Sequence, residues 1–194
     1  MTWTKLLANK DAQKHKTSKK ELDNMRALIA RDLADASLAG LSADRRFATA
    51  YNAALHAANM AIACAGYRIV SKVGHHRVSL ESTKLVLGKA AHKYADYFET
   101  CRRKRSTIDY TFSNVANDTE AKEIVVQAKQ FYVEVEDWIT KNNPAEVPSH
   151  PARCRDTGRS VPSECSPSRG ESCIAVASPA PAETDRSART CRQS

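Results

Sequence analysis

Four consecutive cations, Arg102 to Arg105, form the part of the chain whose residue types most clearly suggest a chemical role. The helix dipole favours cations at a helix C-terminus, but it explains one or two basic residues better than four that repel one another. Clustered cations can instead hold phosphate groups, each reaching a separate backbone anion. The run therefore predicts either an anion-binding face or a helix terminus. Further polar candidates follow it closely, at Ser106, Asp109 and Tyr110.

Histidine is the other residue type that could move a proton here, because its ordinary pKa lies near neutral pH. His75 and His76 stand at the start of a predicted helix. They could supply a general base, or they could form a turn with one ring hydrogen-bonded and the other in solvent. His56 lies among alanines and is expected to be a satisfied interior histidine, whereas His92 is expected to be exposed.

The six cysteines do not form a metal or disulfide pattern. Four of them lie between Cys154 and Cys191, with irregular spacing and no Cys-x-x-Cys pair, so no zinc site is expected. Cys64 and Cys101 lie within helical patterns and are expected to pack as small core residues. The sequence also lacks a glycine-rich phosphate loop, a His-Glu-x-x-His motif and a nucleophile elbow. We therefore expect neither a metal nor another cofactor.

Composition divides the chain into a basic domain and a tail. Residues 1–143 hold 23 of the 30 Lys and Arg residues and 16 of the 22 Asp and Glu residues. All seven prolines lie from Pro144 onward, where large apolar residues are scarce, so residues 144–194 are expected to be a disordered tail. No apolar run approaches the roughly 20 residues of a membrane-spanning helix, and the polar start offers no secretory signal. We expect no membrane association and a cytoplasmic location.

Hydrophobic spacing predicts helices and no strand in the first 143 residues. Ser18 with Glu21 has the form of a capping box at the start of the first helix, and the last helix is expected to begin with Asn117, with Glu120 three residues on. Residues 1–17 are expected to be a flexible N-terminus. The helices are expected at about residues 18–39, 42–65, 75–87, 90–105 and 117–143.

Two features of these helices indicate how they pack. The helix over residues 42–65 carries a stripe of alanines, which lets its neighbours approach closely and predicts a central position. Short connections favour antiparallel neighbours, so residues 18–143 are expected to form an all-α, up-and-down bundle of four to five helices. Glu134, Glu136 and Asp137 are expected to form a solvated acidic face on the last helix.

From about Leu22 to Trp138 the chain resembles the HEPN family, the small helical bundles of prokaryotic toxin–antitoxin and defence systems. The resemblance rests on the order and spacing of several segments. The Asp-Tyr pair makes the chain most similar to small standalone members that carry it where others have His. The segments are Leu38-Ala-Gly40, Phe47-Ala-Thr-Ala-Tyr51-Asn-Ala-Ala, Gly74-His-His76, Arg103-Lys-Arg-Ser-Thr-Ile-Asp-Tyr110 and a closing amphipathic helix.

The resemblance implies a metal-independent endoribonuclease, usually a dimer, whose motif is Arg with His four to six positions later. The Arg can stabilise negative charge that develops on phosphorus, and the His can take a proton from a 2′-hydroxyl. Arg105 and Ser106 match the start of this motif, but Tyr110 occupies the His position. A phenol, whose unperturbed pKa is about 10, is a poor general base at neutral pH. This departure weakens the expectation of cleavage and preserves that of an Arg-lined anion cleft.

We therefore expect a HEPN-like module, a toxin–antitoxin or defence component and a homodimer, that binds RNA or a nucleotidyltransferase partner through its basic face. An active endoribonuclease is one alternative, with Arg105 and Tyr110 as the catalytic pair. A structural interaction module without a nucleic-acid role is another. The resemblance also implies that Tyr51 and Asn52 face the Arg105 region, although Tyr51 is expected mainly to fill the core. The binding face consists of Arg102, Arg103, Lys104 and Arg105, and the other candidates are Ser106, Asp109, His75 and His76.

Overall fold

The computed structural model describes residues 1–110 and 112–143, and the tail predicted over residues 144–194 lies outside them. Within the described part, the predicted all-α bundle is confirmed, with a small two-stranded sheet added to it. The elements are α1 (Trp3–Ala8), β1 (Ala12–Lys14), α2 (Lys19–Asp35), α3 (Ala43–Cys64), β2 (Tyr67–Ile69), α4 (His75–Leu87), the short 3-10 helix η1 (Gly88–Ala91), α5 (His92–Tyr110) and α6 (Asp118–Asn142).

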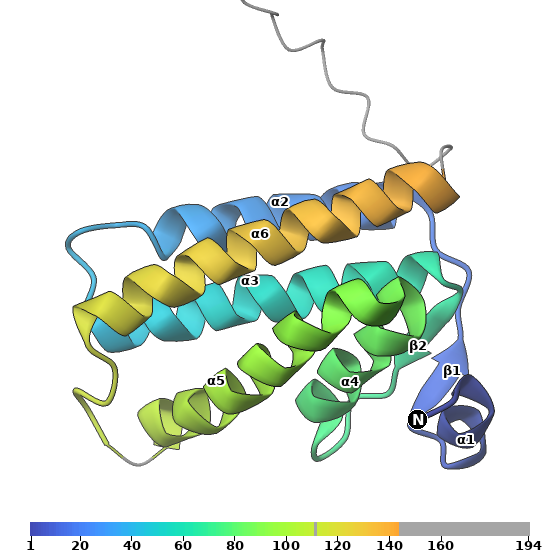
Figure 1. The fold of residues 1–194 in the computed structure, drawn as a ribbon, viewed down its shortest axis with the longest axis horizontal. Coiled ribbons are helices and arrows are strands. Elements are labelled where there is room, and N and C mark those ends of the chain that lie inside the picture. Colours follow the sequence, from blue (N-terminus) through green and yellow to red (C-terminus); the bar gives the residue numbers. More distant parts are fainter. Residues whose placement is uncertain (111, 144–194) are drawn as a thin grey trace, which may run out of the picture. The chain divides into compact units, whose positions relative to one another are not determined.

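The helix α3 is the centre of the bundle, as predicted. In Figure 1, α2 and α6 lie along one side of it, and α4 and α5 lie along the other. Small side chains on α3 allow this close packing, because they bring the neighbouring backbones and larger side chains near the helix axis. The alanines of its stripe are almost fully buried, at Ala50, Ala54, Ala57, Ala58 and Ala61.

Both predicted caps are present, but only the second is a complete capping box, because the Glu21 carboxylate bonds Thr17 and Arg68 instead of the Ser18 backbone. The Ser18 hydroxyl accepts a hydrogen bond from the backbone N–H of Glu21 at 3.2 Å. Asn117 and Glu120 form a complete capping box, in which each side chain accepts a hydrogen bond from the other residue's backbone N–H at 2.9 Å. These bonds satisfy donors that would otherwise have no partner at a helix start, so they fix where α2 and α6 begin.

A buried ion pair joins α2 to α6. Arg26 is only 8% exposed, and its Nε donates to Glu136 at 2.7 Å while its Nη1 donates to Asp23 at 2.9 Å. A buried guanidinium needs such partners, because its desolvation would otherwise be strongly unfavourable. The predicted solvated acidic face is therefore wrong at Glu136, whose carboxylate contacts the neighbouring helix.

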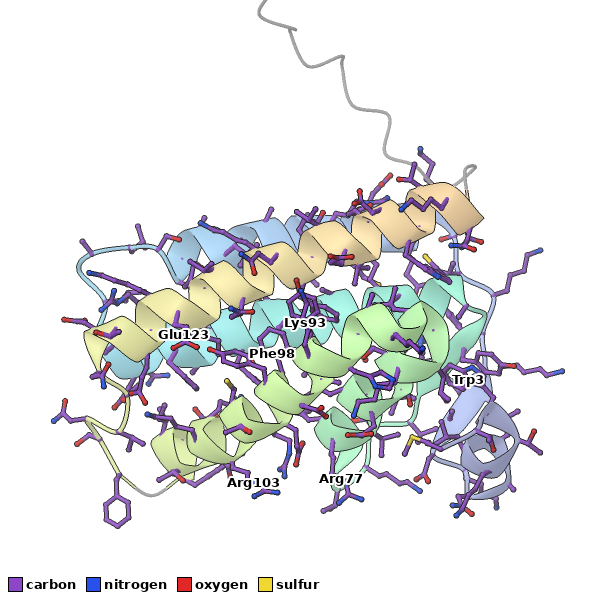
Figure 2. All side chains as sticks on the ribbon, in the orientation of Figure 1. Trp3, Arg77, Lys93, Phe98, Arg103 and Glu123 are labelled. Carbon is purple, nitrogen blue, oxygen red and sulfur yellow. The ribbon has the colours of Figure 1, made fainter. Side chains whose placement is uncertain are left out.

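The N-terminal segment differs from the flexible stretch predicted for residues 1–17. It forms α1 and β1, and β1 pairs antiparallel with β2, with Ala12 opposite Ile69. The Trp3 ring stacks on Tyr67 with 4.0 Å between ring centres, and Leu6 is buried (Trp3 is labelled in Figure 2). The prediction of no strand is also wrong, because pairing across more than 50 residues leaves no mark in local hydrophobic spacing.

Candidate functional site

The basic run lies inside α5 and not at its end. The helix was predicted to stop near Arg105, but it continues to Tyr110. Side chains three or four residues apart share a face of a helix, whereas adjacent ones diverge by about 100°. Arg102 and Arg105 therefore lie on one face, and Arg103 and Lys104 point elsewhere. The four cations that were predicted to form a single binding face are thus divided between different directions.

An open pocket of about 470 Å³ lies between α5 and the segment that leads into α4. It brings together six of the predicted site residues from two parts of the chain that are about 30 residues apart in sequence. Residues 71–74 form the wall beside α4. The six are His75 and His76 of α4 with Arg102, Arg105, Ser106 and Tyr110 of α5.

Arg105 is held within the pocket by contacts that leave part of its guanidinium unsatisfied. Its Nη2 lies 3.0 Å from the carboxylate of Asp109, one turn further along α5. Its guanidinium carbon lies 5.8 Å from the centre of the Tyr51 ring, within the range of a cation–π contact. Its Nε is buried and has no hydrogen-bond partner in the part of the chain that the structure describes. The fold therefore orients this side chain without using all of its donors.

Arg102 is oriented by Glu99, one turn earlier on the same helix. Its Nε and Nη2 each donate to the Glu99 carboxylate at 2.9 Å, the forked geometry that suits a guanidinium and a carboxylate. This hydrogen bonding is the main reason why the pKa of Glu99 lies below its ordinary value. Glu99 was not among the predicted site residues, although its three-residue spacing to Arg102 was a usable signal.

His76 lies against the buried side of the pocket. Its Nδ1 is 3.3 Å from the hydroxyl of Tyr51, a residue of α3 that is fully buried. Burial, helped by the charges of His75, Arg105 and Arg102, lowers the pKa of His76 to about 4. The imidazole is therefore neutral at physiological pH and able to accept a proton.

His75 has a different role from His76. Its Nδ1 lies 2.8 Å from the carbonyl oxygen of Lys72, and its ring meets the His76 ring edge-on with 4.4 Å between centres. The predicted turn with one bonded and one solvated ring is thus only half right, because His76 is half-buried and contacts Tyr51.

The N-terminal segment supports the wall of the pocket. The Lys72 ammonium lies 2.6 Å from the Asp11 carboxylate and donates to the backbone carbonyl of Asn9 at 3.2 Å. Gly74 follows with a φ of +84°, a conformation that L residues rarely adopt, and it caps α4 without a side-chain hydrogen bond. Neither the residues 71–74 nor this support was predicted, because the contacts join positions some 60 residues apart.

Arg103 and Lys104 do not contribute to the pocket. The side chain of Arg103 is 77% exposed and extends away from α5 in Figure 2, with its Nε 3.9 Å from Glu99. Lys104 pairs with Glu120 at the start of α6, and its Nζ lies 5.7 Å from the centre of the Phe47 ring. One of these cations therefore faces solvent and the other links two helices.

The remaining candidates lie at the margin of the site or outside it. Tyr110 lines the rim of the pocket and is 82% exposed. Tyr51 is both a core residue and a neighbour of Arg105, while Asn52 does not line the pocket. His56 is half-buried, with its Nε2 3.8 Å from the Asp32 carboxylate. His92 is exposed, as was expected for that residue. Cys101 is buried, and burial raises its pKa to about 11.

No group of three or more His, Cys, Asp or Glu side chains in residues 1–110 and 112–143 is arranged to hold a metal ion. In the same residues, no helix combines the length and the apolar character needed to cross a bilayer.

The comparison with protein families agrees with the helical fold. Residues 38–136 match the SAV_6107-like HEPN family, and this region contains every residue that lines the pocket. The match covers just over half of the chain, so the protein belongs to the SAV_6107-like HEPN family. No curated protein and no solved structure matches it.

Proposed function

We propose that this protein is a cytoplasmic RNA-binding HEPN module that holds a phosphate group of RNA in the pocket beside Arg102 and Arg105. The observation that carries the proposal is the composition of the pocket. Among the residues that the structure describes, its lining includes three cations, Lys72, Arg102 and Arg105, and two histidines. The carboxylates paired with these cations, Asp11, Glu99 and Asp109, lie behind the lining. A concave surface of one charge attracts an anion more strongly than the same charges spread over a convex surface.

The chemistry of the lining suits a phosphodiester. Guanidinium groups present paired donors that match phosphate oxygens, and Asp109 and Glu99 hold both guanidiniums in place before a ligand arrives. Tyr110 offers an exposed ring at the rim, and aromatic rings in single-stranded RNA sites stack on bases. A phosphate site beside an exposed ring favours RNA over a small inorganic anion.

The test is the affinity of the full chain for a fluorescent single-stranded RNA, measured by anisotropy at several salt concentrations. Arg105→Ala should weaken binding about tenfold, because it removes a charge-assisted phosphate contact. Arg103→Ala is the matched control, since it removes the same charge from the same helix outside the pocket. Equal losses in the two variants would contradict the proposal, and circular dichroism checks that both remain folded.

Salt dependence separates this function from a purely structural one. Phosphate contacts release counterions, so the affinity should fall steeply as salt increases. A shallow dependence, or no binding of RNA, would favour an interaction module. In that outcome, a nucleotidyltransferase whose capture depends on Arg105 would replace RNA as the partner.

We also propose that the protein is a homodimer and a component of a toxin–antitoxin or defence system. Membership of the HEPN family supports both statements. Exposed apolar side chains near the pocket, at Val73, Tyr110 and Phe112, give a second copy a surface to cover. Light scattering on the purified chain measures the oligomeric state directly, and a monomer at micromolar concentration would contradict the first statement.

A further inference from the structure

We propose that His76, and not Tyr110, is the general base of a metal-independent RNA cleavage in this pocket, and that Tyr51 is its positioning residue. The inference rests on the proposed function, because it requires an RNA phosphate beside Arg105. It departs from the spacing that the HEPN resemblance implies, in which the base follows the arginine on the same helix. Here the base comes from α4 and the arginine from α5.

The contact with Tyr51 engages one ring nitrogen of His76 and leaves the other to the reaction. Nδ1 lies 3.3 Å from the Tyr51 hydroxyl, on the buried side of the ring. In the tautomer with its proton on Nδ1, the ring donates to the hydroxyl oxygen and Nε2 keeps its lone pair. Burial raises the pKa of Tyr51, so its hydroxyl keeps its own proton and does not compete as an anion. A fixed ring with a free Nε2 is the arrangement that a general base needs.

The surroundings of His76 keep it unprotonated before RNA binds. The groups that act on it are Tyr51 on α3, His75 on α4, and Arg102, Arg105 and Asp109 on α5. The two guanidiniums disfavour a positive imidazolium, whereas Asp109 favours one. A phosphate bound at the guanidiniums adds negative charge beside the ring and raises its pKa toward neutrality, which makes the base stronger when substrate is present.

Tyr110 is poorly placed for the same task. Its side chain is 82% exposed at the rim, and within residues 1–110 and 112–143 its hydroxyl has no hydrogen bond that would hold it beside the guanidiniums. General-base catalysis requires the acceptor to be held within hydrogen-bond reach of the proton that it removes. The half-buried His76 meets this requirement, and the exposed Tyr110 does not.

The reaction is a transesterification in which all atoms are accounted for. The 2′-hydroxyl gives its proton to Nε2 of His76, its oxygen forms a bond to phosphorus, and the bond from phosphorus to the 5′-oxygen breaks. The departing oxygen keeps the electron pair and takes a proton from a water molecule. The hydroxide formed in this way removes the proton from the imidazolium. The products are a 2′,3′-cyclic phosphate end and a 5′-hydroxyl end, and Arg105 stabilises the charge on phosphorus.

The experiment uses the full chain, a labelled single-stranded RNA and excess chelator, with cleavage and binding measured on the same samples. Wild type should produce cyclic-phosphate ends, and His76→Gln should lower the rate at least about a hundredfold, the usual scale of a general base. RNA affinity should persist in His76→Gln. His92→Gln is the matched control, because it alters an exposed histidine outside the pocket and should cleave as wild type does.

Tyr51→Phe tests the positioning role, because it removes the hydroxyl and keeps the buried ring. It should lower kcat about tenfold with little change in KM, and it should shift the acid limb of the pH–rate profile. A merely structural role would change stability without moving that limb. An unchanged profile would overturn the role of Tyr51.

Three results would overturn the role of His76. The first is that the wild type binds RNA but does not cleave it. The second is that His76→Gln cleaves RNA as fast as the wild type. The third is that Tyr110→Phe or His75→Gln abolishes cleavage while His76→Gln remains active. Failure of wild type to bind RNA at all would instead remove the proposed function. Binding and cleavage are measured separately, so these two failures can be distinguished.

Discussion

The two faces of α5 carry the same kind of side chain in two different environments. Arg102 and Arg105 point into a concave pocket beside His76, whereas Arg103 extends into solvent and Lys104 pairs with Glu120 on α6. All four are consecutive in the sequence, yet the helix separates them by direction. A run of cations on a helix therefore presents one shared face only at positions three or four apart.

The two faces of α5 are also expected to differ in whether they serve ligand binding or the stability of the fold. The guanidiniums on the pocket face are oriented by carboxylates on their own helix, so those pairs hold the side chains ready without joining two elements. Lys104 joins α5 to the capping box of α6. We expect substitutions on the first face to change ligand binding and those on the second to change folding.

The largest effect is expected when the two cations of the pocket face are removed together. Arg102→Ala with Arg105→Ala should weaken binding of single-stranded RNA about a hundredfold and lower the salt slope by about 1.4, or 0.7 for each lost phosphate contact. Arg103→Ala with Lys104→Ala removes the same net charge and should leave the slope almost unchanged. Anisotropy titrations at four salt concentrations measure both quantities. Matching slopes for the two variants would show that the faces are equivalent.

A second, smaller effect concerns the pKa of His76, which is about 4 in the intact pocket. The Arg102→Ala and Arg105→Ala double variant should raise this pKa, because it removes two positive charges that disfavour the imidazolium. The value should stay below 6.5, since burial is the largest cause of the shift. The Arg103→Ala and Lys104→Ala variant should leave it unchanged. Imidazole proton resonances followed between pH 3 and 8 give the comparison, and a pKa near 6.5 in wild type would contradict it.

The smallest effect is expected from the pair between Lys104 and Glu120. Lys104→Ala should lower the free energy of unfolding at pH 7 by less than about 1 kcal/mol, because the pair is partly exposed and screened by solvent. The pKa of Glu120 is lowered in the fold, mainly by its hydrogen bond to Lys104, so the pair stabilises the protein above pH 4.5. As the pH falls below that value, the carboxylate is protonated and the contribution is lost.

Urea unfolding of wild type and Lys104→Ala at pH 7 and pH 3 measures this difference. The gap between the two proteins should narrow at the lower pH. A gap that widened on acidification would mean that Lys104 stabilises the fold through another contact, such as its approach to the Phe47 ring.

The helices could be predicted from the sequence because their information is local. Spacing of apolar residues at three and four positions places Leu22, Ile29 and Ile124 in the core, and all three are fully buried. The caps at Ser18 and Asn117 were predictable for the same reason, since each bond spans three residues. The fold class was therefore predictable from long helices whose starts carry recognisable capping residues.

The rest depended on contacts between distant parts of the chain. The pairing of Ala12 with Ile69 and of Arg26 with Glu136 joins positions that no local pattern relates. The continuation of α5 beyond Arg105 was also missed, because nothing in residues 106–110 marks a helix end or excludes one. The site was therefore predicted as a set of residue types, while their division between two faces required the structure.

Gly74 has a left-handed backbone conformation, so a substitution at this position should change how the chain presents His75 and His76, which follow it. A Cβ there would meet no atom within 4 Å, so an alanine would disturb torsion angles without any collision. Asparagine adopts such angles more readily than alanine does. When every residue type is placed at position 74, the function that each variant retains should therefore follow how readily the residue adopts these backbone angles and not the size of its side chain. Asparagine should rank second to glycine.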